Sequence, residues 1–163
     1  GILPASMNML VNVQVVNLSR NRLYELPPLI EDLTMLKMLI VSGNSLESLP
    51  ARIGSFRSLI QLACTNNQLK EIPATMGNLP MIRQLWLDHN ALESLPPSIG
   101  RCVTLEELNL DHNYLRNLPM SICQLTNLRE LWLHDNEVES LPALIGNLKE
   151  LRTLTLNFNK LTP

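Results

Sequence analysis

Asparagines recur along this 163-residue chain at a fixed spacing of 23 residues: Asn21, Asn44, Asn67, Asn90, Asn113, Asn136 and Asn159. Each belongs to the pattern L-x-x-L-x-L-x-x-N-x-L, with Ile, Val or Cys in some of the Leu places. A short fixed period indicates a stack of similar units, each covering the apolar face of its neighbour. The period therefore predicts a solenoid, and it directs the search for function to one stacked surface.

The unit from Leu105 to Leu115 shows what each position is expected to do. Strand side chains alternate between the two faces of a sheet, so the fourth and sixth positions face the core and the third, fifth and seventh face outward. The Asn is expected to turn inward, where its amide satisfies backbone groups of the turn. A Leu-Pro or Ile-Pro pair then begins a return segment, for which we expect short helical or 3₁₀ turns.

The full motif ends in L-P-x-x-I-G-x-L, as from Leu141 to Leu148, and it resembles the 23-residue intracellular class of leucine-rich repeat proteins. This class includes Scribble- and Erbin-type scaffolds, the leucine-rich scaffold of the Ras–Raf pathway and the Ras suppressor proteins. The resemblance implies an α/β fold, a leucine-rich repeat solenoid with a parallel concave β-sheet and short helical or 3₁₀ convex segments. It also implies protein recognition, with a small GTPase or a phosphatase as the partner.

The repeat boundaries predict a single domain over residues 1–163. It comprises a partial unit at 1–12, six full repeats over 13–150 and a truncated repeat at 151–163. Neither composition nor a linker marks a second domain. Repeat arrays need polar caps at their ends, and the first and last units lack them, so we expect a piece of a longer protein.

Charge and cysteine content narrow the classes of partner and compartment. The net charge is −2 and no repeat column gathers Lys and Arg, which argues against nucleic acid. No apolar run is long enough for a membrane span. Cys64, Cys102 and Cys123 occupy positions of small buried residues rather than disulfide caps, which favours a reducing, cytoplasmic location. Phosphate-binding glycine loops are absent, and no cofactor is expected.

The outward columns predict a partner-binding surface. Trp86 and Trp132 share one column with Asn109 between them, which puts the indoles about 10 Å apart. Acidic side chains surround this pair, and an apolar strip precedes it; the residues predicted to contact a partner are Trp86, Trp132, Asn109, Glu107, Glu130, Asp88, Asp111, Met38 and Ile40. This composition is typical of an interface hot spot for a protein with basic residues and apolar anchors. Alternatively, the indoles cover neighbouring arginine stems, and the charges form cross-strand ladders.

Two chemical alternatives concern the turns after the strands, where Asp88-His89, Asp111-His112 and His134-Asp135 stack. Imidazole and carboxylate are metal ligands, although both residue types are also common in turns. An Asp–His pair without a nucleophile does not predict catalysis. We therefore predict a non-catalytic protein-interaction module of an intracellular scaffold or signalling protein. The alternative is the recognition region of a larger enzyme, such as a cyclase, kinase or ubiquitin ligase, whose catalytic domain lies outside this chain.

Overall fold

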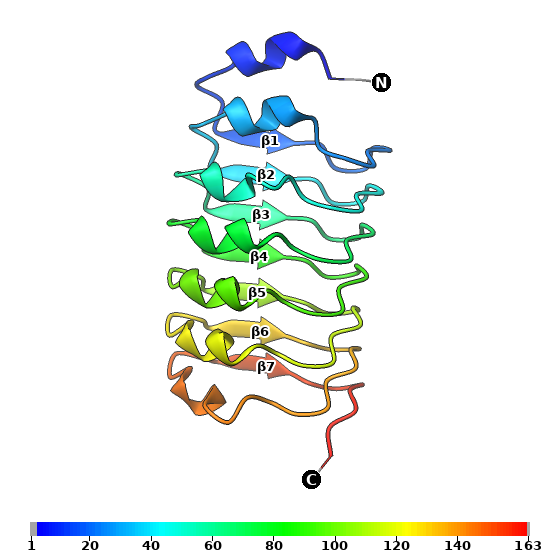
Figure 1. Ribbon diagram of the computed structural model, residues 1–163, viewed down its shortest axis with the longest axis vertical. Helices are drawn as coiled ribbons and strands as arrows, with labels where there is room; N and C mark the ends of the chain where they lie inside the picture. The colour runs from blue at the N-terminus through cyan, green and yellow to red at the C-terminus, as the bar shows by residue number, and fades with distance from the viewer. Residues whose placement is uncertain (1–2, 163) are drawn as a thin grey trace.

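The computed structural model describes residues 3–162, which form a ladder of parallel strands stacked in chain order (Figure 1). Residues 1, 2 and 163, which belong to the predicted partial units, lie outside the described part. The seven strands of residues 3–162 are three residues long each: β1 (Val15–Asn17), β2 (Met38–Ile40), β3 (Gln61–Ala63), β4 (Gln84–Trp86), β5 (Glu107–Asn109), β6 (Glu130–Trp132) and β7 (Thr153–Thr155).

Strand register follows the sequence period without a slip. Val15 pairs with Met38, Met38 with Gln61 and Gln61 with Gln84, and the same 23-residue offset continues to β7. Equivalent residues of successive repeats therefore lie side by side, in columns that cross the sheet.

Short 3₁₀ segments form a second layer beside the sheet (Figure 1). Within residues 3–162 they are η1 (Ala5–Met9), η2 (Pro28–Asp32), η3 (Ile53–Ser55), η4 (Ala74–Asn78), η5 (Pro97–Arg101), η6 (Met120–Gln124) and η7 (Ile145–Asn147). The proline that precedes η1, η2, η4, η5 and η6 is extended and accepts the first 3₁₀ hydrogen bond on its carbonyl, as Pro96 does from the Ile99 N–H at 3.0 Å. The predicted solenoid with a parallel sheet and short 3₁₀ segments is confirmed.

The core lies between the two layers. In strands β1 to β6 the central residue is buried, Leu108 in β5 being an example with no exposed surface. In β7 the equivalent Leu154 is 39% exposed, because among the described residues no further repeat covers it. The sheet face turned away from the 3₁₀ layer carries the third, fifth and seventh positions of each repeat, and we call it the concave face.

At each strand exit, the residue before the Asn adopts a left-handed backbone conformation, with φ between 53° and 69°: Arg20, Gly43, Asn66, His89, His112, Asp135 and Phe158. Arg20 and Phe158 are of types that enter this region at some cost, so the conformation is imposed by the repeat. It turns the chain sharply out of the strand and brings the next residue, the Asn, under the sheet.

Candidate functional site

The two tryptophans lie on the concave face in a single row across β4, β5 and β6. Trp86 is in register with Asn109, and Asn109 with Trp132. All three side chains are half-buried. Neighbouring side chains on the sheet therefore cover part of each indole. The rings still present a solvent-facing part to a ligand.

The third-position column beside the tryptophans combines amide and carboxylate groups. The Gln84 Nε2 donates a hydrogen bond to Glu107 Oε1 at 3.0 Å. The side chain of Glu130 has no ion pair or hydrogen bond within residues 3–162, and it is half-buried. Glu130 is thus the carboxylate of this column whose charge is most available to a partner.

An ion-pair ladder crosses the same strands at the second position of each repeat. Glu106 lies between two arginines, 2.7 Å from Arg83 and 3.2 Å from Arg129. The two arginine side chains are 56% and 50% exposed, so each pair contributes only about 0.2–1 kcal/mol. The ladder predicted as an alternative is therefore present, and it coexists with the Trp row.

Asp88 and Asp111 are less accessible than expected for contact residues. Asp88 is buried and accepts a hydrogen bond from the Thr65 hydroxyl at 2.8 Å. Asp111 accepts the backbone N–H of His134 at 2.7 Å. Burial raises the pKa of the Asp111 carboxyl above its ordinary value, which this hydrogen bond and nearby histidine charge oppose. Both carboxylates stabilise the strand exits as well as contributing negative potential.

The earlier half of the concave face is apolar, but its accessibility is uneven. Met38 and Ile40 on β2 are half-buried, whereas Ala63 on β3 is only 2% exposed. Ala63 is in register with Ile40 on one side and Trp86 on the other, so its larger neighbours cover it. The apolar strip therefore runs from β2 to Trp86, and between them lies the small, buried side chain of Ala63.

The asparagine column lies inside the turns and links successive repeats. The Asn113 Nδ2 donates to the carbonyls of Leu110 and Leu87, and its Oδ1 accepts the Leu92 N–H at 2.9 Å. Leu87 and Leu92 belong to the preceding repeat, a connection that the sequence pattern did not predict. The same bridging bonds recur at Asn44, Asn67, Asn90, Asn136 and Asn159, whereas Asn21 bonds only to its own turn within the described residues.

The chain's three histidines lie ring against ring in a row at the strand exits, which we call the histidine row: His89, His112 and His134. Their ring centroids are 4.1 Å and 4.9 Å apart, and Phe158 continues the row at 5.2 Å. The His112 Nδ1 lies 2.8 Å from Asp135 Oδ2. Within residues 3–162, no three His, Cys, Asp or Glu side chains form a group suited to a metal ion. The predicted columns of His and Asp are present. The rings contact one another, His89 and His112 contact carboxylates, and the His134 ring contacts the Asn157 amide.

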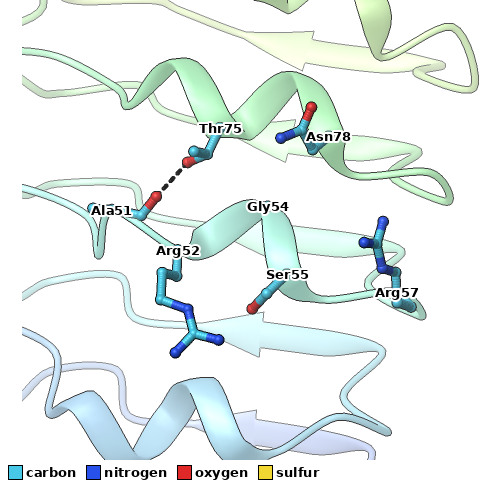
Figure 2. A pocket seen from close by; sticks show the side chains of 7 residues that line it. All are labelled: Ala51, Arg52, Gly54, Ser55, Arg57, Thr75 and Asn78. Carbon is cyan, nitrogen blue, oxygen red and sulfur yellow. Dashed lines mark hydrogen bonds between the residues drawn. The ribbon is translucent and has the colours of Figure 1, made fainter.

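The opposite side of the molecule carries a hollow of about 480 Å³ between η3 and η4, which the sequence did not predict (Figure 2). The Thr75 hydroxyl bridges the two segments by donating to the Ala51 carbonyl at 2.6 Å. Arg52 and Arg57 leave the Gly54–Ser55 segment on opposite sides, so their guanidinium groups do not converge on one ligand. The hollow thus lacks the convergent polar groups of a small-molecule site.

Family models match the chain over two overlapping ranges. The leucine-rich repeat region model matches residues 70–161, which is more than half of the chain. The chain is a leucine-rich repeat protein. A second model, of the leucine-rich repeats of leucine-rich repeat and WD repeat-containing protein 1, matches residues 4–95. Leucine-rich repeat domains are generally protein–protein interaction modules, and the fold is typically non-catalytic.

Solved leucine-rich repeat structures superpose on this one over nearly its whole length. A leucine-rich repeat protein of Leptospira interrogans is 34% identical, with a TM-score of 0.94 over 97% of this chain and 40% of that chain. The ectodomain of the Arabidopsis thaliana receptor kinase GASSHO1/SCHENGEN3, solved with Casparian strip integrity factor 2, is 31% identical, with a TM-score of 0.85 over 99% and 20%. An internalin from Listeria monocytogenes, 22% identical over 98% and 46%, shares the fold with a TM-score of 0.86.

This leucine-rich repeat chain spans less than half the length of each of these solved chains. No curated protein matches it significantly. None of the helices in residues 3–162 combines the length and the apolarity needed to cross a membrane.

Proposed function

We propose that this chain binds a protein partner on the concave face of strands β4 to β6. The single observation that carries the proposal is the row Trp86–Asn109–Trp132, in which two half-buried indoles flank an amide in strict register. Tryptophan is the side chain most enriched in interface hot spots, and the flanking Asn109 supplies hydrogen bonds.

Charge around the row supports a basic partner. Glu107 and Glu130 lie in the neighbouring column, whereas Arg83 and Arg129 are paired with Glu106. The two arginines are therefore partly neutralised, whereas Glu107 and Glu130 form no ion pair within residues 3–162. The partner we propose is a protein segment with basic residues and apolar anchors, the latter occupying the Trp row and the strip of Met38 and Ile40.

The wider role we propose is that of an intracellular scaffold or signalling module, with a small GTPase or a phosphatase as the partner. The support is the 23-residue consensus, together with three buried cysteines that form no disulfide within the described residues. A second candidate role is the recognition region of a larger enzyme. It is favoured by the 31% identity to the ectodomain of a receptor kinase.

Selection of a phage-displayed random peptide library on the purified chain tests the binding face. Peptides rich in Arg or Lys with aromatic or aliphatic residues are the expected outcome. A photo-crosslinking p-benzoyl-phenylalanine in place of Asn109 should capture the selected peptide. The same group in place of exposed Arg101 on η5 should not capture it. Acidic selected peptides, or capture at Arg101 alone, would refute the concave site.

A further inference from the structure

A surface pocket of about 320 Å³ opens beside the histidine row, between the turns that follow β5 and β6. Its walls include His112, Tyr114, Asp135, Glu137 and Lys160, and we call it the His112 pocket. It adjoins the acidic half of the concave face, because His112 and Asp135 stand at the exits of strands β5 and β6. A partner segment bound across these strands would lie beside the opening of the pocket.

The free negative charge of the pocket comes from Asp135. The side chain of Asp135 is 59% exposed, and its Oδ2 lies 2.8 Å from His112 Nδ1. Glu137, by contrast, lies between Lys160 at 3.0 Å and Arg116 at 3.5 Å. When His112 is neutral, its Nδ1–H donates to Asp135, and this pair keeps one negative charge.

Two rings complete the walls. The His112 imidazole is part of the histidine row, and Tyr114 is 55% exposed. A planar guanidinium stacks on such rings while it donates paired hydrogen bonds to a carboxylate. A lysine ammonium group is a compact point charge that can pair with the carboxylate but does not stack on a ring. A pocket with both a carboxylate and rings in its walls therefore favours arginine over lysine.

We propose that the His112 pocket receives an arginine side chain of the partner protein, with Asp135 as its counter-ion, and that protonation of the histidine row releases it. The proposal rests on the proposed function, because it assumes a basic partner on the adjoining face. To the proposed function it adds the identity of one partner side chain, an arginine, and the regulation of its binding by pH.

The release follows from the charges that face the row. The turns after the strands contribute Asp88, Asp111 and Asp135, and the neighbouring turns contribute Glu137, Arg116 and Lys160. Four carboxylates against two cations leave the neighbourhood negative when the histidines are neutral. Histidine side chains change charge between about pH 5 and 8, and three added positive charges reverse that sign. Protonated His112 also neutralises the charge of Asp135, with which it is already hydrogen-bonded.

NMR titration with a tetra-arginine peptide tests the pocket, with a tetra-citrulline peptide of the same shape as the neutral control. At about pH 7.5 tetra-arginine should shift the amide signals of His112, Tyr114 and Asp135. At about pH 5.5 its affinity should be roughly tenfold weaker, since three exposed contacts become unfavourable when the imidazoles carry charge. Equal affinities at the two pH values, or equal binding of the two peptides, would overturn the proposal.

Variants separate the pocket from general electrostatics. Asp135→Asn should abolish most tetra-arginine binding, while Asp32→Asn, an equal charge change on the exposed end of η2, should not. In the triple variant His89→Asn, His112→Asn and His134→Asn, binding should be weaker because the His112 ring is lost, and the remaining affinity should depend little on pH. Asn66 occupies the same repeat position as His89 and His112, and Asn157 the same position as His134, so the backbone accepts Asn at all three sites. Equal losses in Asp135→Asn and Asp32→Asn, with amide signals elsewhere unchanged, would overturn the pocket assignment.

The double variant Trp86→Ala, Trp132→Ala distinguishes this inference from the proposed function. It leaves the His112 pocket intact, so tetra-arginine should bind it as it binds the parent chain. If this variant no longer bound the selected library peptide, while Asp135→Asn bound tetra-arginine as the parent chain does, the pocket proposal alone would be refuted. If the Trp variant still bound the library peptide, while Asp135→Asn lost tetra-arginine, the proposed Trp site would be refuted and the pocket supported.

Discussion

At the scale of single residues, the asparagine column does more than close its own turns. Each interior amide donates to carbonyls of two repeats and accepts one N–H from the preceding repeat, as Asn113 does with Leu110, Leu87 and Leu92. These backbone groups are buried, so no solvent replaces the amide when it is removed. The column therefore fastens neighbouring repeats together as well as shaping each turn.

Asn113→Leu should lower the free energy of unfolding by about 1–3 kcal/mol, because buried groups of two repeats lose their partner. Asn21→Leu is the matched control, since Asn21 is exposed and bonds only to Leu18 and Ser19. Its loss should be well under half as large. Urea denaturation of the two variants measures the difference, and equal losses would contradict the bridging role.

The sequence predicted which residues face inward, because alternation along a strand follows from its geometry. It did not predict the left-handed residues at the strand exits, since that column also contains Arg20 and Phe158, which rarely adopt this conformation. Nor did it predict that Asp88 is buried or that the indoles are half-buried. Those facts depend on how far neighbouring side chains extend, which a register alone does not specify.

At the scale of elements, the 3₁₀ segments approach one another closely at the glycine column. A Cβ added to Gly54 on η3 would lie 2.0 Å from the Thr75 carbonyl oxygen on η4. The I-G-x-L motif thus contains a packing requirement between repeats. The sequence predicted the segments from this motif, but it did not assign the glycine a contact.

Gly54→Ala should destabilise the fold by about 1–3 kcal/mol, since the backbone of η4 must move to admit the methyl group. Gly146 occupies the same column on η7, and a Cβ there would meet nothing within 4 Å. Gly146→Ala should therefore be neutral or slightly stabilising. Thermal unfolding of both variants followed by circular dichroism makes the comparison, and a stable Gly54→Ala variant would refute the close packing.

At the scale of the whole molecule, the main contacts among the described elements join neighbouring repeats, so stability should be graded along the array. Leu108 in β5 is fully buried, whereas Leu154 in β7 is 39% exposed. Native-state hydrogen exchange should show the slowest amides in β3 to β5 and faster exchange in β1 and β7. Uniform protection from β1 to β7 would contradict an array of coupled repeats and indicate a single cooperative unit.

Long-range charge belongs to the same scale. Glu130→Lys should slow association with the selected basic peptide and weaken the salt dependence of the rate, because face charges steer encounter. Glu25→Lys in the first repeat makes the same charge change far from the Trp row and should alter the rate less. Stopped-flow fluorescence at low and high salt measures the association rate and its salt dependence. Equal changes in the two variants would show that Glu130 has no local role in steering the peptide.

The affinity of the double variant Trp86→Ala, Trp132→Ala for the selected peptide tests the central claim most directly. Calorimetry should show a loss of at least about 2 kcal/mol for each ring if the row is the hot spot. Ser98→Ala in η5 should leave the affinity unchanged, and thermal unfolding should show that both variants stay folded. An unchanged affinity in the folded double variant would contradict binding on the concave face.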